Sequence, residues 1–192
     1  RSLPGPRETT VMMAMLMALN AMAIDTMLPA LPDMARDLDI AVSNHRQYII
    51  GVYLIGTAVG SLFYGPLADR YGRKPVMRWA LVAYVLLALG GALVNGFGIM
   101  LALRLGHGFA GAALGVVVTA IIRDLFVGDA MARRMSSIFL VFMVVPVIAP
   151  SIGAVIAALA GWRAIFVLMA LLGLAMMVWI RRLPETLDPA NV

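Results

Sequence analysis

Six long apolar stretches run along the chain, separated by short segments rich in charge, glycine or proline. A helix rises about 1.5 Å per residue, so about 20 apolar residues cross about 30 Å of hydrocarbon. Such a segment must satisfy its own backbone hydrogen bonds, and the sequence lacks the period-2 alternation of a barrel strand, so each stretch is expected to be a helix. The predicted spans are 9–30, 46–67, 78–96, 98–122, 135–160 and 164–181. The pattern predicts an all-α integral membrane protein, with residues 1–192 forming one six-helix bundle.

Composition supports the membrane assignment and excludes several other classes of protein. The chain is 62% apolar and 13% charged, with a mean hydropathy of +0.95. An ordinary soluble domain is about 45–50% apolar and about 25% charged. The net charge of +5 comes from short basic clusters between apolar spans, so no nucleic acid partner is expected. Cysteine is absent and histidine occurs twice, which predicts neither a metal site nor a cofactor.

The distribution of Lys and Arg predicts the orientation of the spans. Only Arg36, Arg46 and Arg163 fall on the side opposite the termini, and Arg104 lies within a span. The other eleven share the terminal side: Arg1, Arg7, Arg70, Arg73, Lys74, Arg78, Arg123, Arg133, Arg134, Arg181 and Arg182. Because cytoplasmic loops carry the excess of basic residues, both termini are predicted to be cytoplasmic. Residues 11–24 also resemble a cleavable signal peptide, but the five spans that follow favour a first transmembrane helix.

The most informative connection follows the second span, at Gly65-Pro66-Leu67-Ala68-Asp69-Arg70-Tyr71-Gly72-Arg73-Lys74-Pro75. Gly65 allows close approach of helices, and Gly72 is able to adopt the positive φ of a tight turn. Asp69 lies among the basic residues Arg70, Arg73 and Lys74. This arrangement suggests a charge-paired latch, and the simpler alternative is a solvated loop that obeys the positive-inside rule.

This string resembles the signature loop of the major facilitator superfamily, G-x-L-A-D-R-x-G-R-K. The matching residues are Gly65, Leu67, Ala68, Asp69, Arg70, Gly72, Arg73 and Lys74. The resemblance implies the amino-terminal half of a twelve-helix transporter, folded as a three-plus-three inverted repeat. It also implies that the loop controls alternation between inward-open and outward-open states, with Arg73 paired to Asp124.

Asp25 is an acidic residue in the outer part of the first span. An ionised carboxylate at mid-bilayer costs about 2.5–3.5 kcal/mol, so Asp25 either faces a cavity where it binds a proton or caps the helix end at the interface. Residues 24–32 and Leu183-Pro184-Glu185-Thr186 resemble segments of the Bcr/CflA group of drug exporters. That resemblance implies a cavity-facing, protonatable Asp25 and export of small hydrophobic drug-like molecules in exchange for protons, across a bacterial-type inner membrane.

Arg104 is the only basic residue deep within a predicted span. A buried guanidinium requires an acid, a carbonyl or water as its partner. Asp25 is the acidic candidate, and backbone carbonyls are the structural alternative. The segment resembles the superfamily's fourth-helix motif R-x-x-Q-G, which is implicated in proton coupling, with His107 in place of Gln. His107 is able to titrate near neutral pH, although a packed and neutral state is favoured.

The fifth span contains Pro146, Pro150 and Gly153, which predict a kinked helix with a tight crossing. It resembles the antiporter motif G-x-x-x-G-P-x-x-G-G, matched only at Pro150 and Gly153. An incomplete match leaves open a sugar or organic-acid proton symporter.

No G-x-S-x-G or paired-His motif supports a membrane enzyme. The expected partners are a small-molecule substrate, protons, the bilayer and a second six-helix half, from the same gene product or a second copy; a non-transporting fragment is the remaining alternative.

Overall fold

Six helices are long and apolar enough to cross a membrane in a computed structural model that describes residues 5–187. They are α1 (Pro6–Asp25), α3 (Tyr48–Tyr71), α4 (Arg73–Leu93), α5 (Phe97–Leu125), α6 (Gly128–Ala160) and α7 (Arg163–Trp179). The short helix α2 (Leu31–Asp37) and three 3-10 turns, η1 (Leu28–Ala30), η2 (Ser43–Gln47) and η3 (Ile180–Arg182), join or extend them. The predicted all-α six-helix membrane fold is confirmed.

The helices extend further into the charged connections than the hydropathy pattern predicted. The segment from Gly65 to Pro75 was expected to be a loop, but it is helical on both sides of Gly72. Gly72 has φ of 94° and is the only break between α3 and α4. Charged residues end the hydrophobic stretch without ending the helix, because a helix continues into water when its backbone bonds are kept. Helix α1, in contrast, ends at Asp25 because Pro29 and Pro32 follow.

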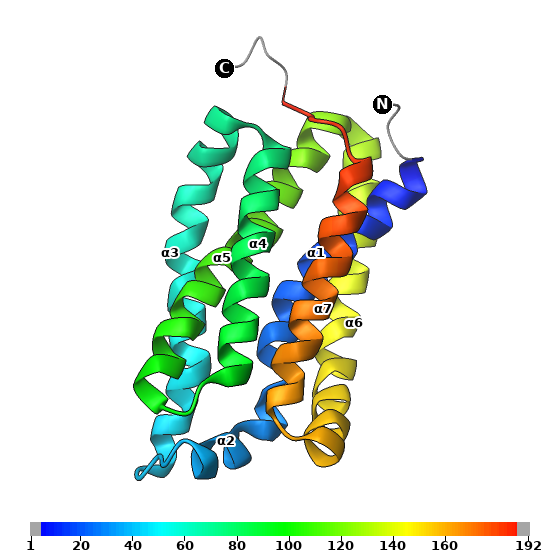
Figure 1. The fold of residues 1–192 in the computed structure, drawn as a ribbon. Helices are drawn as coiled ribbons and strands as arrows, with labels where there is room; N and C mark the ends of the chain where they lie inside the picture. The colour runs from blue at the N-terminus through cyan, green and yellow to red at the C-terminus, as the bar shows by residue number, and fades with distance from the viewer. Residues whose placement is uncertain (1–4, 188–192) are drawn as a thin grey trace.

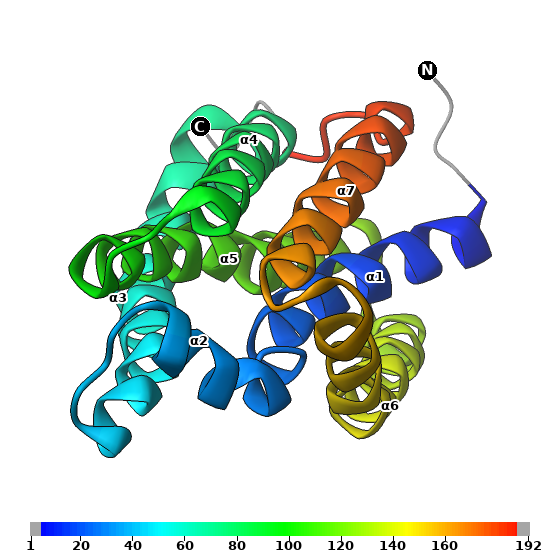
Figure 2. The ribbon, with the colours of Figure 1, turned by 60° about the horizontal axis from the view of Figure 1, so that its bottom comes forward.

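The six long helices form two groups of three (Figures 1 and 2). In one group α3 and α4 both pack on α5, and in the other α6 and α7 both pack on α1 and contact each other. Contacts of α4 with α7 and of α1 with α5 join the groups. Figure 1 shows that the chain enters α1 and leaves α7 at the same end of the bundle, as six spans require.

The opposite end of the bundle carries α2, whose buried residues are Leu31 and Met34. Asp37, the last residue of α2, accepts hydrogen bonds at Oδ2 from Trp162 Nε1 at 2.8 Å and Arg163 Nη1 at 3.1 Å. Arg163 Nη2 also donates to Asn95 Oδ1 at 2.9 Å. These bonds fasten α2 to the turn between α6 and α7 and to the turn between α4 and α5.

Glycines bring α3 and α5 into backbone contact. A Cβ atom at Gly108 would lie 2.0 Å from the Tyr53 carbonyl oxygen, and one at Gly56 would lie 2.1 Å from the Leu105 carbonyl oxygen. Gly56 and Gly60 form a G-x-x-x-G pair, the spacing that puts two glycines on one helix face. Gly153 plays the same part between α6 and α1, because its Cβ would lie 2.0 Å from the Thr26 carbonyl oxygen.

We predict that Gly108→Ala destabilises the bundle by about 2 kcal/mol or more, because the added methyl group meets a carbonyl that cannot rotate away. The matched control is Gly115→Ala on the same helix, where a Cβ would meet nothing within 4 Å. Alanine favours a helix over glycine, so the control is expected to be neutral or slightly stabilised. Thermal unfolding in detergent compares the two, and equal midpoints would contradict the close crossing.

Candidate functional site

A cavity of about 700 Å³ lies between α1, α3 and α5. Its charged residues, Asp69, Arg73, Arg123 and Asp124, come from the ends of α3 and α5 and the start of α4. The rest of its lining is small, apolar or uncharged: Met17, Asn20, Thr57, Ser61, Gly65, Ala68, Ala112, Gly115, Val116, Thr119 and Ala120. The cavity therefore has a charged end, on the side of the bundle where the chain enters and leaves, and a neutral polar interior.

Uncharged polar side chains in the cavity wall are tied to the helices that carry them. Tyr53 donates its hydroxyl hydrogen to Asn20 Oδ1 at 2.5 Å, which links α3 to α1. Thr57 Oγ1 lies 3.0 Å from the Tyr53 carbonyl and 3.2 Å from the Gly108 carbonyl. Ser61 donates to the Thr57 carbonyl at 2.8 Å. The hydroxyl oxygens keep lone pairs, and the Asn20 amide nitrogen keeps its hydrogens, for a molecule in the cavity.

At the charged end, Arg73 lies between two carboxylates. Its Nε is 3.0 Å from Asp124 Oδ2 and its Nη1 is 2.5 Å from Asp69 Oδ1. The Arg73 side chain is only 9% exposed, so this guanidinium is far less screened by water than an ordinary surface residue. Arg73 and Asp124 thus contact each other as the resemblance implies, and their part in transport stays a prediction.

The other basic residues of this loop do not surround Asp69 as expected. Arg70 is exposed, and its guanidinium carbon lies 5.3 Å from the centre of the Tyr71 ring. Lys74 donates through Nζ to the carbonyl of Leu183 and, at 3.1 Å, to that of Arg181. Asp69 lies near the end of α3 and Arg73 begins α4, so the turn at Gly72, and not one continuous helix, brings the Arg73 guanidinium to Asp69.

Arg104 is fully buried and binds backbone carbonyls. Its Nε donates to the Ile49 carbonyl at 3.2 Å and its Nη2 to the Ala23 carbonyl at 2.9 Å. The guanidinium carbon also lies 4.2 Å from the centre of the Tyr53 ring. In the described chain Arg104 forms no ion pair with Asp25, and it is absent from the cavity lining. The backbone-carbonyl alternative for Arg104 is the one observed, and a part of Arg104 in proton coupling stays a prediction.

The Ala23 carbonyl has no hydrogen-bond partner within α1, because the helix ends two residues later, and Arg104 supplies that bond. The Met27 amide, which would bond to Ala23 in a continuing helix, bonds to the Ile24 carbonyl instead, at 3.1 Å. A carbonyl left without its helical partner in a dry interior is costly. Arg104 therefore joins the end of α1 to the start of α3, and its buried charge is offset by carbonyl dipoles and an aromatic face.

His107 is fully buried next to Arg104. Its Nδ1 lies 3.3 Å from Arg104 Nη1, and a guanidinium only donates hydrogen bonds, so Nδ1 is the acceptor and carries no proton. The proton of the neutral ring is then on Nε2, which has no hydrogen-bond partner in the part of the chain described. The Tyr84 ring lies against His107, with 4.1 Å between ring centres. This arrangement fits the packed, neutral histidine that the sequence favours.

Asp25 lies at the last position of α1, at the end of the bundle opposite Arg73. Its side chain is partly buried and forms neither an ion pair nor a side-chain hydrogen bond with another residue between 5 and 187. Its carboxylate forms no cap bond in the described residues, and the choice between a cavity-facing and an interfacial Asp25 stays a prediction. Asp25 is left able to bind a proton or a ligand.

Residues 13–192 match the sequence family described as the Major Facilitator Superfamily. The chain belongs to this superfamily. Its relatives include a bicyclomycin resistance protein homolog of Haemophilus influenzae, 38% identical over 93% of this chain and 45% of the relative. Another is multidrug resistance protein D of Escherichia coli, 30% identical over 84% of this chain and 41% of the relative.

The superfamily fold also appears in solved structures. The solved structure of a proton:xylose symporter, XylE, superposes with a TM-score of 0.84 over 94% of this chain and 45% of its own length, at 14% identity. At that identity the likeness shows the fold alone. The chain spans about half the length of the superfamily members that it matches. The predictions of superfamily membership, and of a transporter family rather than an enzyme, are confirmed.

Within the superfamily fold, several site residues escaped the sequence analysis. Asn20, Thr57 and Thr119 line the cavity, and the buried Tyr53 holds the side chain of Asn20 by a hydrogen bond. Their signal was available, because polar side chains are rare and costly within apolar spans. Of the predicted site residues, Gly65, Asp69, Arg73 and Asp124 line this cavity. The others do not: Asp25, Arg70, Gly72, Lys74, Arg104, His107, Pro146, Pro150 and Gly153.

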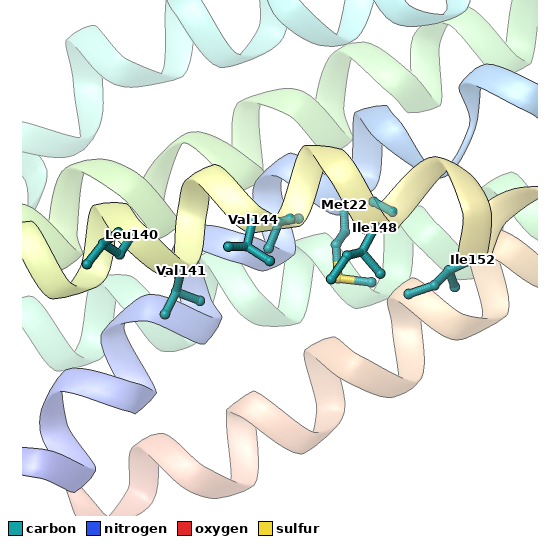
Figure 3. A pocket seen from close by; sticks show the side chains of 8 residues that line it. Met22, Leu140, Val141, Val144, Ile148 and Ile152 are labelled. Atoms are coloured by element: carbon teal, nitrogen blue, oxygen red, sulfur yellow. The ribbon is translucent and has the colours of Figure 1, made fainter.

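A second hollow, of about 380 Å³, is wholly aliphatic apart from one thioether and lies along α6 (Figure 3). Figure 3 shows Met22 of α1 beside Ile148, with four further labelled side chains along the same helix: Leu140, Val141, Val144 and Ile152. The flexible thioether of Met22 gives the groove an adaptable apolar surface. No polar side chain lines this groove, which suits hydrocarbon.

We predict that Arg104→Lys destabilises the superfamily domain by roughly 2 kcal/mol, because an ammonium keeps the charge but not the planar fork that reaches two carbonyls at once. The control is Arg123→Lys, since Arg123 is exposed and unpaired in the described chain. Midpoints of thermal unfolding in detergent measure both variants. An Arg104→Lys protein as stable as its control would contradict the joining role of the guanidinium.

Proposed function

We propose that this chain forms the amino-terminal six-helix half of a transporter that exports small, largely hydrophobic drugs in exchange for protons by alternating access. The observation that carries the proposal is the cavity between α1, α3 and α5, with uncharged polar walls and an ion-paired end. The names of the relatives, one for bicyclomycin resistance and one for multidrug resistance, support a drug as substrate.

The cavity chemistry favours a neutral molecule with apolar surface. Asn20, Thr57 and Ser61 offer hydrogen bonds without charge, and Met17 and Val116 offer apolar contact. The two acids at its end already face Arg73, so neither is free to attract a cation. The cavity is partly open to the outside of the described domain, and we propose that a second six-helix half, from the same gene product or a second copy, closes it.

Asp25 is the proposed proton site. A carboxylate without a partner in a partly buried position lowers its cost by binding a proton. In the proposed cycle, a proton arriving from outside neutralises Asp25 and the drug leaves outward. Proton release to the cytoplasm then resets the carrier. Arg104 fixes the end of α1 two residues before Asp25, so its contribution to coupling is to position the acid, without contact between the two.

The latch at the charged end is proposed to set the conformational equilibrium. Arg73, the first residue of α4, contacts Asp69 near the end of α3 and Asp124 near the end of α5. Separating a weakly screened guanidinium from two carboxylates costs more than breaking a solvated surface pair. The latch therefore holds one arrangement of helices until a second half or the substrate compensates for the lost contacts.

Proton symport of a sugar or an organic acid remains the second candidate, because the partial antiporter motif is explained by helix packing at Gly153. Its lack of a side chain allows contact with the Thr26 carbonyl, so the partial antiporter motif at Pro150 and Gly153 reports tight packing as readily as export. Accumulation of substrate in right-side-out vesicles under an inward proton gradient would favour symport. The basic residues on the terminal side support the proposed orientation, with both termini cytoplasmic in a bacterial inner membrane.

We predict that Asp25→Asn abolishes proton-driven export, because the amide cannot bind the transported proton, while the protein still inserts. The assay is uptake of bicyclomycin into inside-out vesicles under an imposed pH gradient, with the protein expressed from its complete reading frame. Asp39→Asn is the matched control: Asp39 is exposed, and asparagine tolerates its φ of 51°. Full proton-driven uptake by the Asp25 variant would exclude Asp25 as the coupling acid.

A further inference from the structure

Helix α4 begins without a capping side chain of its own. Its N-cap residue is Gly72, which has no side chain to offer, and no side-chain cap bond is made there. The first backbone N–H groups of a helix have no acceptor within the helix. Pro75 has no N–H, so Arg73 and Lys74 carry the first two amides that need one.

Glu185, more than a hundred residues later in the chain, satisfies both amides. Its Oε1 accepts from the Arg73 amide at 2.9 Å and its Oε2 from the Lys74 amide at 3.1 Å. The amides of Thr186 and Leu187 also donate to Oε1, at 2.9 Å and 3.0 Å, and fix the carboxylate in place. A carboxylate at a helix N-terminus is further stabilised by the helix dipole.

The segment that follows α7 receives bonds in return. Lys74 Nζ binds the carbonyls of Arg181 and Leu183, where α7 and its terminal 3-10 turn end. Thr186 Oγ1 donates to Asp124 Oδ2 at 3.2 Å, the same oxygen that accepts from Arg73 Nε. We call residues 183–187, with their bonds to Arg73, Lys74 and Asp124, the clasp.

Gly72 is required by the clasp as well as by its backbone angle. A Cβ at this position would lie 2.7 Å from Glu185 Oε2. Gly161 has nearly the same backbone conformation, with φ of 78° and ψ of 165° against 94° and 153° at Gly72. However, a Cβ at Gly161 would meet nothing within 4 Å. The two glycines therefore separate the effect of positive φ from the effect of the Glu185 contact.

We propose that Glu185 is a positioning residue for Arg73, and that the clasp makes the chain leaving α7 part of the latch. Glu185 holds the backbone of Arg73 while Asp69 and Asp124 hold its guanidinium, so the residue is fixed at both ends. A change in the contacts of Arg73 must then alter the contacts of residues 183–187, because both bind Asp124. The link to transport rests on the proposed function, whereas the contact of Glu185 with the start of α4 does not.

The first test is a mutant cycle read by thermal unfolding in detergent, in protein expressed from its complete reading frame. Gly161→Ala lowers the melting temperature by the cost of positive φ alone, and Gly72→Ala is expected to lower it by a few degrees more. In a Glu185→Ala background the two glycine substitutions should lower the melting temperature equally, because no carboxylate meets the new methyl group at position 72. An excess that persists without Glu185 would overturn the contact, whatever the protein transports.

The second test asks whether Glu185 acts on the latch, and it uses the absence of cysteine from the chain. Ser61→Cys places one thiol in the cavity wall, and its rate of labelling by a maleimide in inside-out vesicles reports access to the cavity. Glu185→Ala should change this labelling rate about fivefold, which corresponds to the free energy lost with a helix cap. The change should have the same direction as the change caused by Arg73→Ala.

The matched control is Asp129→Asn, since Asp129 is an exposed acid in the first turn of α6 that has no partner in the described chain. It should leave the labelling rate unchanged. Glu185→Asp, which keeps the charge, should restore part of the parent rate. If Glu185→Ala lowered the melting temperature but left labelling equal to the control, its role would be structural only and the proposal would be overturned.

Discussion

Polar groups within the hydrocarbon must find their partners inside the bundle, and the structure depends on this constraint. It explains why Arg104, although charged, binds the carbonyl that α1 leaves free where it ends. It also explains the tight pairing of α3 with α5, where glycines let carbonyls and helices approach without side chains between them. Tyr53 and Thr57 satisfy their hydroxyls on neighbouring helices. The exposed surface of α6 can remain apolar because lipid requires no bonds from it.

The fold was predictable from the sequence because span length and the spacing of basic residues are local properties. The Arg73–Asp124 contact was also predictable, although only through the resemblance of the loop. The partners of Arg104 were not, because no pattern in one sequence shows which carbonyl lacks its own helical bond. Glu185 was noticed only as part of a similar segment, since its amide partners lie more than a hundred residues earlier. The charged segment around Gly72 was predicted to be a loop because the apolar stretch ends at the membrane surface. Hydropathy therefore does not show that the helix continues into water.

The latch and Asp25 lie on different helices, at opposite ends of the bundle. The latch, held by Arg73 and the clasp, lies where the chain enters and leaves the bundle. Asp25 lies at the other end, next to the point where α1 stops. The neutral polar cavity begins at the latch and reaches Asn20, less than two turns before Asp25. Movement of α1 against α3 would therefore act on the proposed proton site and the latch together, as the proposed proton coupling requires.

The central claim is that the space between α1, α3 and α5 is the substrate path. Thiol accessibility in inside-out vesicles tests it most directly, with Thr119→Cys in the cavity wall and Leu86→Cys on the exposed side of α4 as the control. We predict that a membrane-impermeant maleimide labels position 119, that bicyclomycin slows this labelling, and that position 86 stays unlabelled within hydrocarbon. Equal labelling of both positions, or labelling of position 119 that no transported drug slows, would contradict the account.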